Sequence, residues 1–234
     1  MNPTSVLAEL IETIGTQTTG GTLDIPKLLD YQQPPQTGWD IWLLMGGRGI
    51  GKNVAGAAWA AEQAEVHQPG HNGLLIGPEF RAVREVMVEG PTGLLKTLGD
   101  RVDNYNRSTF EITTTSGSRI YMRSADTPEP LRGLNLAWAW CDEIGSWKYP
   151  AVWHEGLVPA LRAGNHPQTV VTTTPRPTEL IKHLVAIEDG RVHRTTATTF
   201  DNPHLPESAI RSLKASYEGT RIGRQELYLS LIHI

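Results

Sequence analysis

The chain has 234 residues, of which 39% are hydrophobic and 20% are charged, enough for one sizeable hydrophobic core. Its 21 basic and 25 acidic side chains give a net charge of −4, which excludes a large positive field that would hold a polyanion by charge alone. The single cysteine excludes an internal disulfide, and no apolar run approaches the roughly 18 residues of a membrane helix. We therefore expect a soluble, intracellular protein without a leader peptide or a membrane partner.

Short apolar runs alternate with helical patterns, which predicts a mainly parallel sheet flanked by helices on both faces. Strands are expected at 40–45, 73–78, 134–143, 168–175 and 191–198, with a hairpin at 108–125 that turns at Ser116 and Gly117. Helices are expected at 5–14, from 51 to about 66, at 80–88 and 151–162, and from Thr178, Pro206 and Thr220. We expect an N-terminal approach segment at 1–38, a core at 39–200 and a C-terminal helical segment at 201–234.

The stretch GGRGIGKN, residues 46–53, follows an apolar strand and opens a helix. It matches Gly-x4-Gly-Lys, a loop whose backbone N–H groups and lysine surround a phosphate, although a glycine-rich turn with a solvated lysine is the simpler alternative. Such loops usually continue with Ser or Thr, whereas Asn53 stands here. Its amide oxygen can also bind a hard cation, so we expect weakened Mg²⁺ affinity and retained ATP binding. The predicted nucleotide contacts are Gly46, Gly47, Arg48, Gly49, Ile50, Gly51, Lys52 and Asn53.

Two further stretches place polar groups at the ends of expected strands. In WCDEI, residues 140–144, Asp142 would hold Mg²⁺ and Glu143 would polarise the water that attacks ATP, unless the pair is only a solvated turn. In TVVTTTPRP, residues 169–177, Thr173 or Thr174 would contact the γ-phosphate or the water, unless these threonines only favour a strand. Arg48 and Arg132 are both candidates for a cation that stabilises the transferring phosphoryl group.

These stretches together resemble the large subunit of tailed-bacteriophage terminases, the ATPase that packages double-stranded DNA into a procapsid. The resemblance covers the chain from about Gln32 to Leu227. It is carried by QQPPQTGWDIWLLMGGRGIGK, GLLIGPEFRAVREVMVEGPTGLL, LRGLNLAWAWCDEIGSWKYPAVW, VVTTTPRPTELIKHL and YEGTRIGRQEL, in the order of the family.

The resemblance implies an α/β P-loop NTPase fold of the additional-strand type. It implies Lys52 on the phosphates, Asp142 on Mg²⁺, Glu143 as the catalytic carboxylate and the threonines at 172–174 as the coupling motif. Gln32, or alternatively Gln33, would read the adenine. Either Arg48 within the loop or Arg132 toward a neighbouring subunit would be the catalytic arginine.

The same resemblance implies double-stranded DNA, a portal protein and the terminase small subunit as partners, with self-association into a ring on the portal. The expected location is the cytoplasm of an infected bacterium, outside the mature virion. Family members usually continue into a nuclease domain after GRQEL, whereas this sequence stops at YLSLIHI, so nuclease activity is not expected. Two other functions stay open, a helicase-like nucleic-acid translocase and a nucleotide-binding assembly module with little hydrolysis.

Overall fold

The computed structural model describes residues 22–127, 131–218, 220 and 223. The helix expected at 5–14 lies outside the described residues, and the helix expected from Thr220 lies mostly outside them. No helix within the described part of the chain is long and apolar enough to cross a membrane.

One eight-stranded sheet forms the centre of the molecule, in the order β3-β4-β5-β2-β6-β7-β1-β8. The strands are β1 (Ile41–Gly46), β2 (Gly73–Gly77), β3 (Val102–Asn106), β4 (Glu111–Thr114), β5 (Arg119–Ser124), β6 (Trp138–Asp142), β7 (Gln168–Thr173) and β8 (Val192–Ala197). From β5 to β8 in this order, neighbouring strands pair in parallel. Strand β4 pairs antiparallel with both of its neighbours, β3 and β5. Because β7 lies between β1 and β6, the predicted additional-strand sheet is confirmed.

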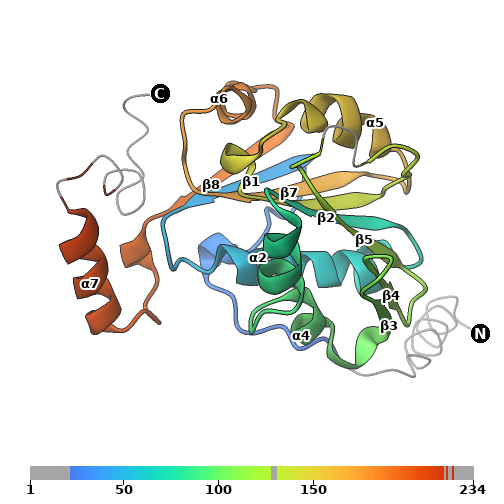
Figure 1. Cartoon of the computed structure of the whole chain (residues 1–234), viewed down its shortest axis with the longest axis horizontal. Helices are drawn as coiled ribbons and strands as arrows, with labels where there is room; N and C mark the ends of the chain where they lie inside the picture. The colour runs from blue at the N-terminus through green and yellow to red at the C-terminus, as the bar shows by residue number, and fades with distance from the viewer. Residues whose placement is uncertain (1–21, 128–130, 219, 221–222, 224–234) are drawn as a thin grey trace, which may run out of the picture.

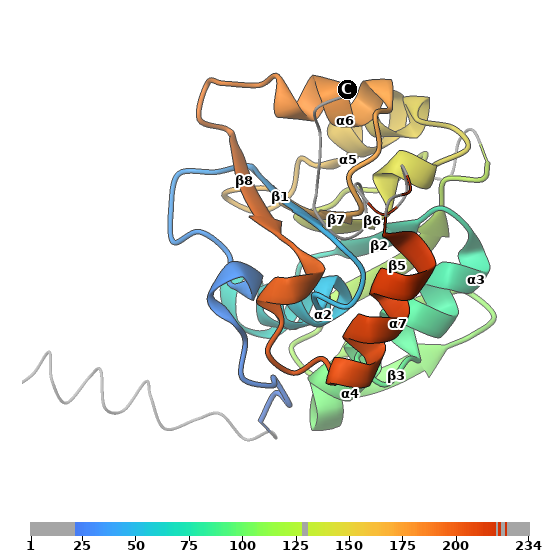
Figure 2. The same ribbon diagram turned by 90° about the vertical axis from the view of Figure 1, so that its left-hand side faces the viewer.

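Helices cover both faces of this sheet (Figure 1). One face carries α2 (Lys52–Glu62), which continues into the π-helical turn η2 (Gln63–His67), with α3 (Phe80–Ala82), η3 (Val83–Val88) and α4 (Leu94–Leu98). The other face carries η6 (Val152–Leu157), α5 (Val158–Ala160) and α6 (Glu179–Val185). Figure 2 looks onto the edge at which β1 ends, with α7 (Glu207–Tyr217) in the foreground.

The two hydrophobic clusters follow from the alternation of side chains along buried strands. Successive residues of a strand point to opposite faces, so every residue of a doubly covered strand can be apolar. In β1, Trp42 and Leu44 pack in the cluster beneath α2, whereas Leu43 and Met45 pack in the cluster beneath α6. This double burial explains why the central strands read as continuous apolar runs.

Most predicted elements are present, and the differences have local causes. The expected hairpin is β4 and β5, with Gly117 in its turn at a φ of 85°. Strand β3 and helix α4 were not predicted. The sequence VDNYN of β3 lacks an apolar run because this strand pairs only with β4 at the edge of the sheet. Strand β6 begins at Trp138, four residues later than expected, because Leu136 forms only an isolated bridge with Leu161.

Gly56 on α2 gives a direct test of this packing. A Cβ atom at Gly56 would clash with Cε2 of Trp140, a fully buried side chain of β6. We predict that Gly56→Ala lowers the free energy of unfolding by about 1–3 kcal/mol, even though alanine favours a helix. The control is Ser212→Ala on the exposed side of α7, which we expect to leave stability unchanged or slightly raised. Urea denaturation measures both, and an unchanged Gly56→Ala variant would contradict the packing.

Candidate active site

Three neighbouring strands end together at the edge shown in Figure 2. Met45 of β1 pairs with Thr173 of β7, and Asp142 of β6 pairs with Thr172. Because the strands are parallel, the residues that follow them lie at the same edge of the sheet. The structure therefore brings the loop after β1, the carboxylates after β6 and the threonines after β7 to one place.

The loop at 46–51 turns sharply between β1 and α2. Gly49 and Gly51 have φ values of 78° and 80°, a region of backbone conformation that glycine adopts at little cost. The side chain of Ile50 is fully buried, and its Cδ1 atom lies where a Cβ of Gly46 would be. Ile50 thus anchors the loop in the core, so that the backbone rather than a side chain can face an anion.

Lys52, the first residue of α2, reaches back over the loop. Its Nζ atom donates hydrogen bonds to the carbonyl oxygens of Gly46 at 3.0 Å and Gly47 at 3.2 Å. The same atom lies 3.5 Å from Oγ1 of Thr174 and 3.8 Å from Oε1 of Glu143. The ammonium group of Lys52 therefore contacts groups at the ends of all three strands, β1, β6 and β7.

Glu143 occupies a strained backbone position, with φ 47° and ψ 48°. Its Oε1 atom accepts a hydrogen bond from Oγ1 of Thr174 at 2.9 Å, and its Oε2 atom accepts one from the Thr174 N–H at 3.2 Å. Thr173 is buried, and its hydroxyl donates to the Thr174 carbonyl at 3.1 Å. Of the two threonines that the sequence left open, Thr174 is the one that faces Glu143 and Lys52.

Asp142 is held from within the sheet. Thr172 donates its hydroxyl to Oδ1 of Asp142 at 2.6 Å, and Trp140 in turn donates its Nε1 hydrogen to Oγ1 of Thr172 at 2.8 Å. Burial, and then the charge of Glu143, raise the pKa of Asp142 to about 7, against the opposing effects of the Thr172 hydroxyl and Lys52. The charged form of this carboxyl group is therefore unfavourable unless a cation lies beside it, and otherwise the group tends to bind a proton.

Asn53 binds the loop between η3 and α4. Its Nδ2 atom donates to the carbonyl oxygen and to Oγ1 of Thr92, both at 2.8 Å. A carbonyl oxygen can only accept, so these bonds fix which end of the amide is the nitrogen. Oδ1 of Asn53 is buried and has no hydrogen-bond partner among the residues that the structure describes.

The Asn53 amide oxygen and the Asp142 carboxylate are both ligand types that a hard cation such as Mg²⁺ prefers. Across the part of the chain that the structure describes, no three His, Cys, Asp or Glu side chains are arranged to hold a metal ion. Mg²⁺ usually uses one or two protein ligands together with phosphate oxygens and water. Asn53 and Asp142 are consistent with that mode of binding.

Gln32 lies against the loop, whereas Gln33 does not. Gln32 is buried, donates its Nε2 hydrogen to the Ile50 carbonyl at 2.7 Å and accepts a hydrogen bond from the Leu29 N–H at 2.9 Å. Gln33 lines a separate cavity of about 980 Å³. Of these two glutamines, only Gln32 is in direct contact with the predicted nucleotide loop.

The two arginines occupy different surroundings. Arg48 is exposed, and its guanidinium carbon lies 5.6 Å from the centre of the Tyr217 ring on α7. Arg132 is exposed and lines a cavity of about 450 Å³ together with Glu155 and Arg162. Arg48 therefore belongs to the loop at the carboxyl edge, and Arg132 lies on the side of η6 and α5.

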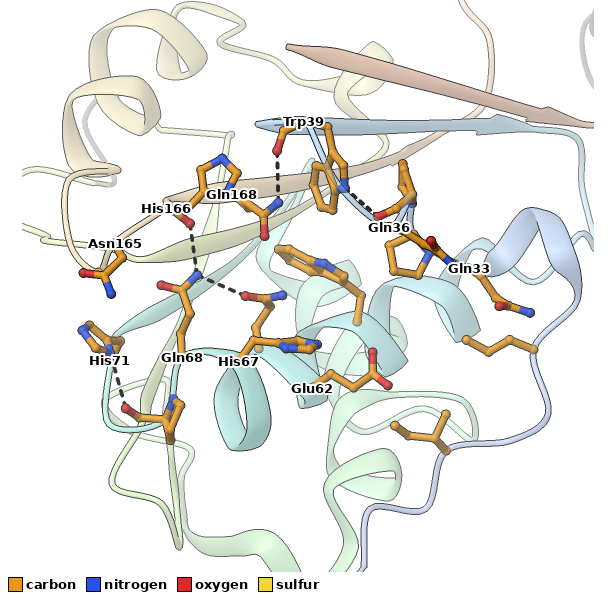
Figure 3. Close-up of a pocket in the computed structure, with 18 of the residues that line it drawn as sticks. Gln33, Gln36, Trp39, Glu62, His67, Gln68, His71, Asn165, His166 and Gln168 are labelled. Carbon is orange, nitrogen blue, oxygen red and sulfur yellow. Dashed lines mark hydrogen bonds between the residues drawn. The ribbon is translucent and has the colours of Figure 1, made fainter. Parts of the chain in front are cut away.

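The cavity of about 980 Å³ lies at the opposite edge of the sheet (Figure 3). Its wall includes Trp39, which precedes β1, and Gln168, the first residue of β7. Gln68 and His71, which follow η2, also line it. None of its lining residues belongs to the loop at 46–53. Cavity size and the predicted chemistry thus point to different edges, and we place the site where the charged groups converge.

Several described residues that form hydrogen bonds at the site were not predicted from the sequence. Thr92 contacts Asn53, and Tyr31, Thr199 and Asn202 each donate a hydrogen bond to the loop. Thr199 begins the 3₁₀ turn η7 (Thr199–Asp201) and Asn202 follows it, so in sequence they read only as capping or turn residues.

Comparisons with known proteins show the family and the fold of the chain. A family model described as terminase large subunit, T4likevirus-type, N-terminal, matches residues 43–233. The chain is similar to the large terminase ATPase domain of Thermus phage P74-26, with 16% identity and a TM-score of 0.65 over 82% of this chain and 89% of that chain. At this identity the similarity establishes the fold. No curated protein matches the chain significantly.

A second similar structure is the large terminase of a thermophilic bacteriophage in complex with ADP. It shares 19% identity and a TM-score of 0.66 over 81% of this chain and 48% of that chain. The chain therefore spans about half the length of this second terminase.

The raised pKa of Asp142 predicts how stability depends on pH. An acid whose pKa is higher in the folded than in the unfolded state stabilises the fold at low pH, and this contribution is lost as the pH rises toward about 7. Without metal, the melting temperature of Asp142→Asn minus that of wild type should therefore be larger at pH 8 than at pH 5. Thermal unfolding at several pH values measures this, and parallel curves for the two proteins would contradict the raised pKa.

Proposed function

Because this chain belongs to the terminase large-subunit family, we propose that it is an ATP-hydrolysing motor domain that drives double-stranded DNA into a viral procapsid. The observation that carries the proposal is the contact of Lys52 with both Glu143 and Thr174 at the ends of three adjacent strands. A phosphate-binding loop, a carboxylate and a polar strand end are the parts that phosphoryl transfer to water requires.

Each group has a role in this proposal. The N–H groups of the loop and the ammonium of Lys52 bind the phosphates of ATP. Glu143 accepts a proton from the attacking water, and Thr174 holds both oxygens of that carboxylate in place.

Asn53 and Asp142 would hold Mg²⁺, which supplies positive charge to the β- and γ-phosphates when bound. Gln32 contacts the adenine while it supports the loop.

Arg48 is our first candidate for the catalytic arginine within this chain, because it lies in the loop itself. Arg132 would act only on ATP bound to a neighbouring subunit, because it lies on the side of η6 and α5. Both assignments are part of the proposal. In a ring of subunits both arginines could act, Arg48 on the ATP of its own subunit and Arg132 on the ATP of a neighbouring subunit.

The wider assignments rest on the family. We propose double-stranded DNA, a portal protein and the terminase small subunit as partners, and the cytoplasm of an infected bacterium as the place of action. We also propose the division into 1–38, 39–200 and 201–234, and we do not propose nuclease activity. A nucleotide-binding assembly module is the second candidate function, favoured by Asn53 where a hydroxyl residue is usual.

The first test is magnesium-dependent ATP hydrolysis by the purified chain, with and without DNA. We predict that Glu143→Gln lowers turnover by a factor of about 100 or more and keeps ATP binding, because the amide cannot accept the proton. Lys52→Ala should lose ATP binding. Lys182→Ala, which removes an exposed lysine of α6, is the control and should behave as wild type.

Asn53→Thr is a further arm of this assay. A threonine hydroxyl binds Mg²⁺ directly, so the Mg²⁺ concentration that gives half-maximal hydrolysis should fall. Nucleotide binding without turnover in wild type and Asn53→Thr would support the assembly module. Equal turnover in wild type and Glu143→Gln would contradict the proposed mechanism.

A further inference from the structure

We propose that Tyr31, Thr199 and Asn202 are positioning residues that set the shape of the phosphate-binding loop by holding its carbonyl groups. We call these three residues the loop clamp. The inference rests on the proposed function and adds to it, because it assigns a role in nucleotide binding to residues near both ends of the P-loop core, far from the loop in sequence.

Three consecutive carbonyl groups of the loop accept side-chain hydrogen bonds. The Thr199 hydroxyl donates to the Arg48 carbonyl at 2.9 Å, and Nδ2 of Asn202 donates to the Gly49 carbonyl at 2.6 Å. The Tyr31 hydroxyl donates to the Ile50 carbonyl at 3.0 Å, beside the bond from Gln32.

These bonds decide which way the peptide groups face. The C=O and N–H of one peptide plane point in opposite directions, so a carbonyl fixed outward directs its N–H inward. Gly49 and Gly51 have positive φ angles and little steric hindrance, so their flanking peptides rotate easily without an external restraint. An anion site depends on several N–H groups that converge before the ligand arrives. The loop clamp supplies that restraint.

The donors are themselves held in place. Asp201 of η7 accepts hydrogen bonds from the N–H of Thr198 at 2.6 Å and from its hydroxyl at 2.8 Å, which closes the turn that carries Thr199. Oδ1 of Asn202 accepts a hydrogen bond from the His204 N–H at 2.9 Å, which orients its amide. Burial and the charge of Asp201 raise the pKa of Tyr31, so its hydroxyl remains a donor across the neutral range.

The segment that carries Thr199 and Asn202 also connects the nucleotide loop to α7. Leu205 follows η7 and packs so close to Gly49 that an added Cβ would lie 2.9 Å from its Cδ1 atom. The chain then enters α7, where Tyr217 lies under the guanidinium of Arg48. The loop is therefore in direct contact with the segment 199–217 at several residues.

The experiment compares variants that remove one hydroxyl each. Thr199→Val and Tyr31→Phe keep the shape of the side chain and lose the donor, and Thr199→Ser keeps the donor. The matched control is Thr195→Val, which removes a β8 hydroxyl that accepts a hydrogen bond from Trp42 away from the loop. Binding of a fluorescent ADP analogue is titrated in each protein, and hydrogen exchange of residues 46–52 is followed without nucleotide.

We expect the dissociation constant to rise about fivefold for Thr199→Val and for Tyr31→Phe, as the loss of a neutral hydrogen bond of ordinary strength implies. It should rise further when these two substitutions are combined. Exchange of the loop amides should accelerate. Asn202→Ala should weaken binding in the same direction. Thr199→Ser should bind as wild type, and Thr195→Val should lose stability without a change in binding, which separates positioning from a general loss of structure.

Wild-type affinity in Thr199→Val and Tyr31→Phe, alongside lost affinity in Lys52→Ala, would overturn the loop clamp and leave the proposed function standing. Equal weakening in Thr199→Ser and Thr199→Val would also overturn it. Failure of the wild-type chain to bind the ADP analogue would overturn the proposed function, and the inference with it.

Discussion

Two adjacent carboxylates, Asp142 and Glu143, end a strand that is buried on both faces, and this electrostatic conflict governs the site. Like charges so close to a low-dielectric core are unfavourable unless cations or donors face them. Lys52 offsets part of the charge at 3.8 Å from Glu143. Thr172 of β7 and Thr174, which follows β7, donate hydroxyl hydrogen bonds to Asp142 and Glu143 respectively. The remaining negative charge favours a further cation at this edge, as the proposed binding of a magnesium–nucleotide complex requires.

The position of β7 explains how the fold meets this constraint. Strand β7 lies between β1 and β6, so its end stands between the predicted phosphate-binding loop and the two carboxylates. The threonine hydroxyl groups at this end bind the carboxylates. Thr172 and Thr174 are two residues apart, yet one binds Asp142 within the sheet and the other binds Glu143 beyond it. The left-handed backbone of Glu143 makes the second contact possible by turning its side chain toward β7.

The parts of this structure that were predictable are those with a strong local signal. Strands β1, β2 and β6 are apolar runs bounded by glycine or charge, and β7 is a run of valine and threonine, residue types that favour strands. Lys52 follows β1 after the glycine-rich loop, and Glu143 follows β6 directly. Strand β3 was missed because an edge strand needs no apolar pattern. Tyr31, Thr199 and Asn202 were missed because their partners are backbone carbonyls far away in sequence, which no side-chain motif records. The choice of Thr174 over Thr173 likewise required the geometry of Glu143.

The most direct measurement is a crystal structure of the chain with Mg²⁺ and a non-hydrolysable ATP analogue. The account predicts the triphosphate on the N–H groups of residues 47–52, with the γ-phosphate in contact with Lys52 and facing Glu143. It also predicts the metal ion beside Asp142 and Asn53. A nucleotide bound at the opposite edge of the sheet, in the cavity lined by Trp39 and Gln168, would contradict the account.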